Sequence, residues 1–301
     1  MIQLQKYTWL IETIRKAGKI SLEEISERWE RNKDLSDYKP LSRATFNRWR
    51  DAIFDQFGII ISCQRAGGYL YYIENPEDID EDELRKWMLD SFAVCNLIGE
   101  NLSLKDRILV NQIPSARNHL ATLLEAMREN HVVTITYCGF NKTKSHKFPI
   151  EPYCVKLFEN RWYVLAYNVQ YHGMRIYGLD RIEQLEITDD TFKLPKDFSA
   201  SACFLNYYGI IINESDKAER IVIRAFGEHI PYMKSLPLHH SQKLLEDYGE
   251  YADFELYLVP TYDFIMRLLH VGAMVEVISP ASLRRTMKGW ISDMYDLYKN
   301  D

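Results

Sequence analysis

Hydrophobic residues recur at helical spacing in two short segments at the start of the chain. The first places Leu10, Ile11 and Ile14 on one face and ends at Gly18, a residue suited to a left-handed helix C-cap. The second follows Ser21, which is expected to cap its helix together with an acidic residue three positions on. The chain is therefore predicted to begin with two short helices.

A third helix is predicted between Ser42, its expected N-cap, and Gly58. Its apolar stripe consists of four large residues at helical spacing, Phe46, Trp49, Ile53 and Phe57. Two β-branched or aromatic runs then flank the turn sequence RAGG and predict a β-hairpin. Three helices followed by a hairpin are typical of a winged helix-turn-helix, which we expect over residues 1–74.

The polar face of the third helix is cationic. Arg43, Asn47 and Arg50 come into line on it, and no acidic residue occurs between Tyr38 and Arg50. Because Arg binds guanine edges or phosphates and Asn pairs with adenine, this face suits a major groove. The expected DNA-binding set also takes in the first helical turn and the hairpin tip: Ser42, Arg43, Thr45, Asn47, Arg48, Arg50 and Arg65. A merely solvated face and a protein-docking module remain open alternatives.

Residues 75–130 are predicted to form an acidic linker and a helical segment. The stretch NPEDIDEDE combines a proline with six acidic residues. Two strongly apolar helical patterns follow, LRKWMLDSFAVCNLIGEN and SARNHLATLLEAMREN. Such helices either pack on the neighbouring domains or pair with a copy of themselves. We favour a contribution to a homodimer interface, since two-fold dimers bind paired half-sites in DNA.

From His131 the pattern changes from helical spacing to alternation. Strands are predicted for HVVTITY, KFPIEPYCVKLF, NRWYVLAYNV and MRIYGLDRIEQLEIT, the last counted as a fourth strand with its continuation. Short strands at this spacing favour a small, strongly bent β-barrel over residues 131–195. Residues 196–301 then alternate strands and helices in an α+β order with antiparallel pairing. The predicted fold class is α+β multidomain.

Charge is distributed unevenly along the 301 residues. The net charge is −6, yet residues 1–72 carry twelve Lys and Arg against nine Asp and Glu, which gives +3 and leaves −9 for the remainder. Between Thr136 and Arg181 there are seven basic residues and three acidic ones, within a half that is acidic overall. Both local excesses of positive charge indicate anionic partners.

Other compositional features exclude several classes of protein. No apolar run approaches the roughly 20 residues that span a bilayer, and the first segment lacks a signal-peptide core, so we expect a cytoplasmic protein without a membrane partner. The five cysteines are scattered and form no C-x-x-C pair. His239 and His240 are placed in a strand, where neighbours point to opposite faces, and are therefore not expected to bind a metal. No metal site and no cofactor are predicted.

Two motifs in the β-rich region resemble the signature of WYL-domain proteins: RWYVLAY at 161–167 and RIYGLDRI at 175–182. The segments ITY and IEPY stand upstream, where that family has its Tyr and its Pro-containing strand, and Val164 replaces the family's Leu. The resemblance implies a winged helix, a helical linker, an Sm-like barrel (WYL) and a C-terminal extension. It further implies a bacterial transcription regulator, of a kind tied in several cases to DNA damage or phage defence. The barrel of such a regulator would sense a nucleotide or a short single-stranded nucleic-acid fragment.

The same region supplies the candidate ligand-binding residues. Tyrosine rings offer stacking surfaces for a base, and arginine forks match phosphate geometry. The predicted set is Tyr137, His146, Lys147, Arg161, Tyr163, Tyr167, Arg175 and Arg181. Alternation along the strand places Trp162 in the core rather than in the site. For Arg181, a salt bridge with Asp180 or Glu183 is the competing interpretation.

These features together predict a ligand-responsive, DNA-binding transcription regulator, a repressor by the habit of the family. The principal alternative is an Sm-like adapter that binds RNA or single-stranded DNA without recognising an operator. An enzyme is not expected, because the chain has no P-loop, H-E-x-x-H or G-x-S-x-G motif and no carboxylate cluster placed for metal-assisted hydrolysis. The C-terminal extension is assigned either to dimerisation or to closure over the ligand.

Overall fold

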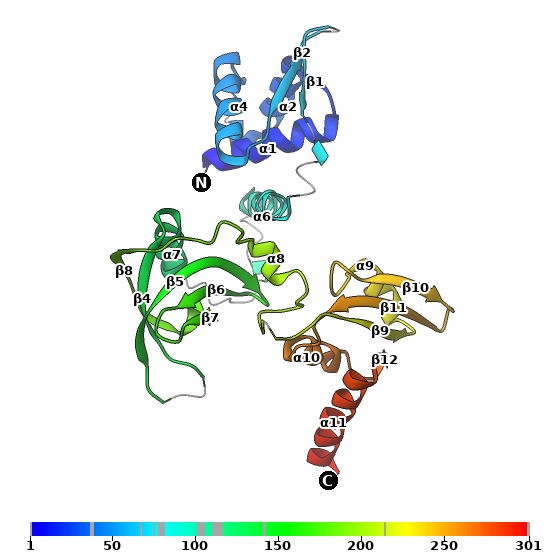
Figure 1. Ribbon diagram of the computed structural model, residues 1–301. Helices are drawn as coiled ribbons and strands as arrows, with labels where there is room; N and C mark the ends of the chain where they lie inside the picture. The colour runs from blue at the N-terminus through cyan, green and yellow to red at the C-terminus, as the bar shows by residue number, and fades with distance from the viewer. Residues whose placement is uncertain are drawn as a thin grey trace. The chain divides into compact units, whose positions relative to one another are not determined.

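The structure is a computed structural model. It describes residues 2–36, 39–66, 68–74, 76–77, 82–100, 106–109, 117–140, 143–213 and 215–299. The chain divides into two compact units, Met1–Asn111 and Gln112–Asp301 (Figure 1). None of the described helices combines the length and the apolar composition that crossing a membrane would require.

The first unit combines helices with a small antiparallel sheet. The helices are α1 (Ile2–Ala17), α2 (Leu22–Arg31), α3 (Lys33–Ser36), α4 (Arg43–Phe57) and α6 (Glu83–Glu100). The strands β1 (Ile20–Ser21), β2 (Ile61–Gln64) and β3 (Leu70–Ile73) form a sheet in the order β1-β3-β2. The predicted helices and hairpin are present, and α3 is an additional short helix that was not predicted.

Local signals in the sequence account for the ends of these helices. Ser21 Oγ accepts a hydrogen bond from the backbone N–H of Glu24 (3.2 Å), and the Glu24 carboxylate accepts one from the Ser21 N–H, so the capping box is complete. Helix α4 ends at Gly58, whose φ of 63° lies in the left-handed region that glycine enters without strain. The predicted caps are therefore confirmed.

The first unit has one apolar core, to which α6 contributes. Phe46, Trp49, Ile53 and Phe57 of α4 are all buried, as their spacing predicts. Leu89 of α6 is buried in the same core. The two helical patterns predicted between residues 75 and 130 thus lie in different units, since α7 (Arg117–Glu129) packs in the second.

The second unit begins with a five-stranded antiparallel sheet beside α7. Its strands are β4 (His131–Tyr137), β5 (His146–Phe158), β6 (Arg161–Asn168), β7 (Gly173–Gly178) and β8 (Ile182–Thr191), in the order β7-β6-β5-β4-β8. Among the described residues β7 and β8 do not pair, so the sheet stays open instead of closing into the expected barrel. The expected continuation of the fourth strand is also wrong. A 3₁₀ turn, η2 (Leu179–Arg181), separates β7 from β8, and β8 pairs with β4 at the far side of the sheet.

The two faces of this sheet have different surroundings. Val164 and Ala166 of β6 are fully buried in a core with Leu123 of α7, and Trp162 packs against that core as alternation predicts. The neighbouring residues Arg161, Tyr163 and Leu165 alternate with them and belong to the other face.

The C-terminal part of the second unit is a four-stranded antiparallel sheet with helices. In chain order it comprises β9 (Glu219–Phe226), α9 (His229–Ser235), β10 (Lys243–Asp247), β11 (Tyr251–Leu258), α10 (Tyr262–Val271), β12 (Val275–Ser279) and α11 (Ala281–Tyr298). The strand order β10-β11-β9-β12 follows from a β-α-β-β-α-β succession (Figure 1). The predicted α+β order with antiparallel pairing is confirmed.

The histidine pair lies outside the strands, contrary to prediction. His239 and His240 occupy a turn before β10, and their ring centroids are 4.0 Å apart. His239 is buried, with Nε2 2.9 Å from the carbonyl oxygen of Leu205 and Nδ1 2.7 Å from Ser241 Oγ. In the part of the chain that the structure describes, no three His, Cys, Asp or Glu side chains gather in a way that would hold a metal ion.

Candidate functional site

Three of the four arginines predicted to bind DNA on α4 and the hairpin are exposed. Arg43 and Arg48 lie on α4, and Arg65 follows β2. Within the described ranges, none of these three guanidinium groups has an acidic partner within 4.0 Å. Exposed cations that are not neutralised locally keep their charge available for phosphate groups.

Ser42 and Thr45 occupy the N-terminal turn of α4 and bond to each other. Ser42 Oγ accepts a hydrogen bond from the Thr45 N–H (3.2 Å) and lies 2.9 Å from Thr45 Oγ1. Both hydroxyl groups therefore contribute to the cap. Asn47 is half-buried one turn further along.

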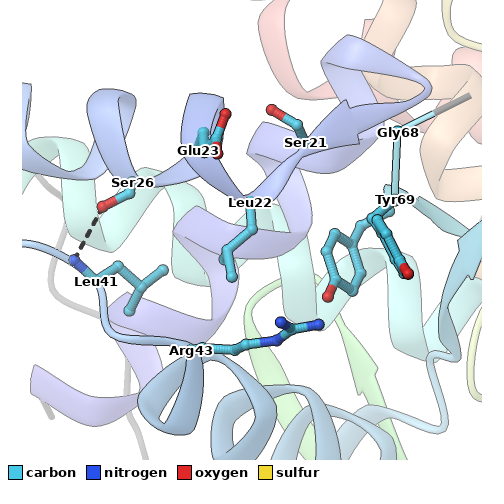
Figure 2. Close-up of a pocket in the computed structure, with 9 residues that line it drawn as sticks. Ser21, Leu22, Glu23, Ser26, Leu41, Arg43, Gly68 and Tyr69 are labelled. Atoms are coloured by element: carbon cyan, nitrogen blue, oxygen red, sulfur yellow. Dashed lines mark hydrogen bonds between the residues drawn. The ribbon is translucent and has the colours of Figure 1, made fainter. Parts of the chain in front are cut away.

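A cavity of about 530 Å³ lies beside the start of α4. Figure 2 shows Arg43 extending from α4 toward Tyr69, with Ser21, Leu22, Glu23 and Ser26 on another side of the cavity. The loop before α4 is held there, since the Leu41 N–H donates to Ser26 Oγ at 3.2 Å (Figure 2).

Tyr69 was not predicted as a site residue. It has a φ of 57°, a left-handed conformation that is uncommon for an aromatic residue, and its side chain is 57% exposed. It follows a glycine pair in the hairpin turn, and that pair was the only sequence signal for its unusual backbone. The conformation presents a large, exposed ring in the cavity that Arg43 also lines (Figure 2).

Arg50 faces a different part of the surface from Arg43. It lines a second cavity together with Asp51, Phe54 and Asp55. Its Nε is 4.0 Å from Asp51 Oδ1. Arg50 is half-buried among acidic neighbours, and its predicted contact with DNA stays a prediction with a weaker electrostatic basis than that of Arg43 or Arg48.

In the second unit, a cavity of about 480 Å³ lies beside β6 and β7. Arg175 from the edge strand β7 and Arg181 from η2 both line it, as does Leu165 of β6. Arg175 is exposed, donates one hydrogen bond to the Met174 carbonyl oxygen (2.8 Å), and has no acidic partner among the described residues. Two of the predicted ligand-binding residues are thus brought together at one opening.

Arg161 and Arg181 share a carboxylate at this site. Arg161 Nη1 lies 2.6 Å from Asp180 Oδ2, and Arg181 Nε lies 3.9 Å from Asp180 Oδ1. The second distance is too long for a hydrogen bond, and both of those atoms are buried with no hydrogen-bond partner in the described parts of the chain. The salt bridge between Arg181 and Asp180 is therefore weak, and Asp180 forms its strong salt bridge with Arg161.

Gly178 allows this group to pack closely. A Cβ atom at this position would lie 2.6 Å from Arg181 Nη2 and 2.7 Å from Asp180 Oδ1. The glycine of the RIYGLDRI motif is therefore explained by sterics, because any side chain would displace the Asp180–Arg181 pair.

The tyrosines are only partly available for stacking. The Arg181 guanidinium lies 5.5 Å from the Tyr137 ring centroid, and the Tyr137 hydroxyl accepts a hydrogen bond from the Gly178 N–H (3.4 Å). Burial raises the pKa of Tyr137 and of Tyr163, and Arg181 opposes the rise in both. The rings of Tyr137 and Phe140 lie next to Arg181, and the guanidinium is 4.9 Å from the Phe140 ring centroid. Tyr167 is half-buried and pairs with Met174 across the sheet.

The remaining predicted residues lie at the start of the central strand of the sheet, where they pair with β4. His146 and Lys147 begin β5 and are exposed. Lys147 Nζ forms a 3.1 Å ion pair with Glu186, so its charge is already partly neutralised. Neither residue is among the described residues that line the 480 Å³ cavity.

Sequence reasoning missed one wall of the cavity. Ile210, Ile211, Ile212 and Asn213 line it although they lie far from the WYL-like motifs in sequence. They follow α8 (Ala200–Phe204) in an irregular stretch, Leu205–Asn213, which we call the strap. The isoleucine run was the available signal, but periodicity does not tell what an isolated apolar run packs against.

Comparisons with known proteins identify two domains in the second unit. Residues 118–187 match the WYL domain, and residues 217–295 match the WCX domain. The chain therefore contains a WYL domain, which holds Arg161, Arg175 and Arg181, followed by a WCX domain. The strap lies between the two matched ranges.

Two solved structures are similar over most of the chain at low identity. Proteasome accessory factor B/C (PafBC) of Arthrobacter aurescens matches 95% of this chain at 15% identity with a TM-score of 0.38, and this chain spans 45% of its length. A CRISPR Cas-related protein matches 93% of this chain at 10% identity with a TM-score of 0.35, with 86% of its own length covered. A search of curated protein sequences finds no match.

Proposed function

We propose that the protein is a ligand-responsive transcription regulator, whose N-terminal unit binds duplex DNA and whose WYL domain binds a nucleotide or a short single-stranded nucleic acid. The observation that carries this proposal is the grouping of arginines on two separate surfaces, and among them Arg43, Arg48, Arg65 and Arg175 have no acidic partner in the described parts of the chain. Arg43, Arg48 and Arg65 lie on the first unit, and Arg175 and Arg181 line a cavity in the second. Both arrangements suit phosphate.

The N-terminal unit is proposed to be a winged helix-turn-helix. Support comes from the succession of α1, α2 and α4 before the β2–β3 hairpin, and from the sheet order β1-β3-β2. In such a module the polar face of α4 enters the major groove, while the hairpin contacts the backbone or the minor groove. Arg48 would bind a guanine edge or a phosphate of the duplex, and Arg65 and Tyr69 would contact the duplex from the hairpin.

The cavity of the WYL domain is proposed to be the sensing site. A volume of about 480 Å³ falls in the range of small-ligand pockets. Arg175 offers a guanidinium without an acidic partner among the described residues, and Arg181 lines the same cavity. A bound phosphate would accept hydrogen bonds from the Arg175 guanidinium.

Ligand and DNA are proposed to be coupled through a change between two arrangements of a homodimer. Typical coupling free energies are about 1–3 kcal/mol, or roughly 5- to 150-fold in affinity. An exposed apolar stripe on α6 supports the proposed contribution of this helix to the dimer, with Leu84, Trp87 and Val94 exposed on one face. By resemblance to other WYL-domain regulators, the protein is proposed to be a repressor that acts in the cytoplasm.

The DNA-binding part is tested by selecting duplexes from a random library with the purified full chain. The proposal predicts enrichment of a two-fold sequence and loss of its binding in Arg48→Ala, with binding retained in Arg128→Ala, an equal charge change on α7. If no duplex is enriched and the protein binds single-stranded RNA or DNA, the proposal is wrong and the protein is better explained as an Sm-like adapter.

A further inference from the structure

The strap closes one side of the proposed ligand cavity with apolar side chains. Ile210 and Ile212 are half-buried, Ile211 is 39% exposed, and all three line the cavity that Arg175 and Arg181 line as well. The cavity therefore combines cationic forks with an aliphatic surface. A bare phosphate would use only the arginines and leave the aliphatic wall in contact with water.

The strap is fixed from the WCX side by Asp263, in the first turn of α10. Asp263 Oδ2 accepts hydrogen bonds from the backbone N–H groups of Ile210 (2.8 Å) and Ile211 (2.9 Å). A carboxylate that accepts two backbone hydrogen bonds is a strong and directional anchor. It holds the backbone of the two residues whose side chains form the wall.

Gly209 brings the strap close enough for this anchor. A Cβ atom at position 209 would lie 2.2 Å from Asp263 Oδ2 and 2.6 Å from Asp263 Cβ. The Asp263 side chain is short and hydrogen-bonded, so it has little freedom to move away. Any residue other than glycine would push the strap off α10.

A second anchor comes from the WYL sheet. Lys156 Nζ donates a hydrogen bond to the Gly209 carbonyl oxygen (2.8 Å) and lies 4.0 Å from the centroid of the Phe204 ring. On the WCX side, the Val259 N–H donates to the Asn206 carbonyl oxygen (2.8 Å). The strap is thus held by both domains at its middle, next to the cavity.

We infer that the strap is the specificity wall of the cavity. Held in place by Asp263, it selects anions that carry an apolar body of about nucleobase size over small bare anions. This inference rests on the proposed sensing function and adds to it the wall that would select a nucleotide over a bare anion, and a positioning residue outside the WYL match. Asp263 does not contact the ligand in this scheme and acts through Ile210 and Ile211.

The volume of the cavity limits how much of a ligand it can enclose. A cavity of about 480 Å³ accommodates one phosphate with one base and sugar, and a longer strand would have to leave through the opening. The base would lie against the isoleucines, and no tyrosine ring is required as a stacking partner.

The test is calorimetric titration of the purified full chain with three probes: inorganic phosphate, thymidine, and deoxythymidine 5′-monophosphate. We expect the monophosphate to bind at least about 10-fold more tightly than phosphate, since burial of one face of a base contributes on this scale. In Asp263→Ala, which removes the oxygen that accepts both backbone hydrogen bonds, the ratio of the two affinities should fall to within about 2-fold of unity, while the affinity for phosphate changes less than about 2-fold.

Two further variants keep the test decisive. Ile211→Ser removes part of the wall without touching the anchor and should lower the preference in the same direction. Asp247→Asn, an equal charge change on the exposed strand β10, should leave it unchanged. Thermal melts of each variant verify that the domains remain folded.

The outcomes separate this inference from the proposed function. If the wild type binds neither anion, the sensing function itself is wrong, and the inference falls with it. If the wild type binds phosphate and the monophosphate equally well, or if Asp263→Ala and Ile211→Ser both keep the full preference, only the specificity wall is overturned.

Discussion

Replacing Asp180 by Asn should destabilise the protein and, at the same time, strengthen its binding of anions. Asp180 is the carboxylate between two of the site arginines, 2.6 Å from Arg161 and 3.9 Å from Arg181. An anionic ligand competes with it for the same guanidinium groups and is repelled by its charge. The substitution should therefore lower stability and raise the affinity for anions, a combination that few other roles for Asp180 would produce.

The expected magnitudes follow from exposure and distance. The Asp180 side chain is 14% exposed and that of Arg161 is 41% exposed, so the pair lies between a surface and a buried salt bridge. Loss of its charge should lower the free energy of unfolding by about 1–2 kcal/mol. Removing one negative charge roughly 8 Å from a bound phosphate, at an effective dielectric constant of about 40, should strengthen binding by about 1 kcal/mol, or ~5-fold.

The assays are urea denaturation for stability and calorimetric titration with deoxythymidine 5′-monophosphate for affinity. Asp190→Asn is a matched control, because Asp190 is exposed on β8 and does not line the cavity. Unchanged or weaker binding by Asp180→Asn, with unchanged behaviour of the control, would show that the anion does not bind near Arg161 and Arg181.

Three further predictions concern the other parts of the molecule. Arg48→Ala should reduce the slope of log affinity for duplex against log salt by about 1, the contribution of one phosphate contact; a wild-type slope would exclude this contact. Burial lowers the pKa of His239 in the folded protein. As the pH falls through about 6.5, the unfolded chain therefore binds more protons than the folded protein, and the contribution of His239 to stability is lost. The stability difference between wild type and His239→Asn should therefore shrink between pH 7 and pH 5 in thermal melts, and a constant difference would contradict this. Ser21→Ala should lower the free energy of unfolding of the first unit by about 1 kcal/mol in urea, and no change would mean that the cap of α2 contributes nothing.

Local signals in the sequence were sufficient for most helices and strands. Ser21, Ser42 and Gly58 end helices through bonds or backbone conformations that involve only nearby residues. The apolar stripe of α4 and the alternation along β6 likewise depend on spacing alone. These features could be predicted because their physical causes lie within a few residues.

Features that depend on distant partners could not be predicted in the same way. The sequence contains no signal that β8 pairs with β4, since the pairing joins strands separated by three others. The alternation of the MRIYGLDRIEQLEIT stretch concealed the turn at η2, which brings Asp180 between Arg161 and Arg181.

The candidate site was predicted only in part for the same reason. Arg175 and Arg181 could be identified by residue type and charge context, but the choice between ligand and carboxylate for Arg161 depends on where Asp180 lies. The isoleucines of the strap join the cavity through Asp263, 52 residues away from Ile211. No pattern of local periodicity carries that information.

We propose that occupation of the WYL cavity changes the affinity of the N-terminal unit for its duplex. The most direct measurement is the dissociation constant of the selected duplex, by fluorescence anisotropy, with and without saturating deoxythymidine 5′-monophosphate or a short single-stranded DNA. For the wild type we predict a change of at least about 5-fold. Arg175→Ala should show none while it retains its affinity for the duplex, and Arg220→Ala, a charge change on β9, should respond like the wild type. Equal dissociation constants for the wild type with and without both ligands would contradict the account.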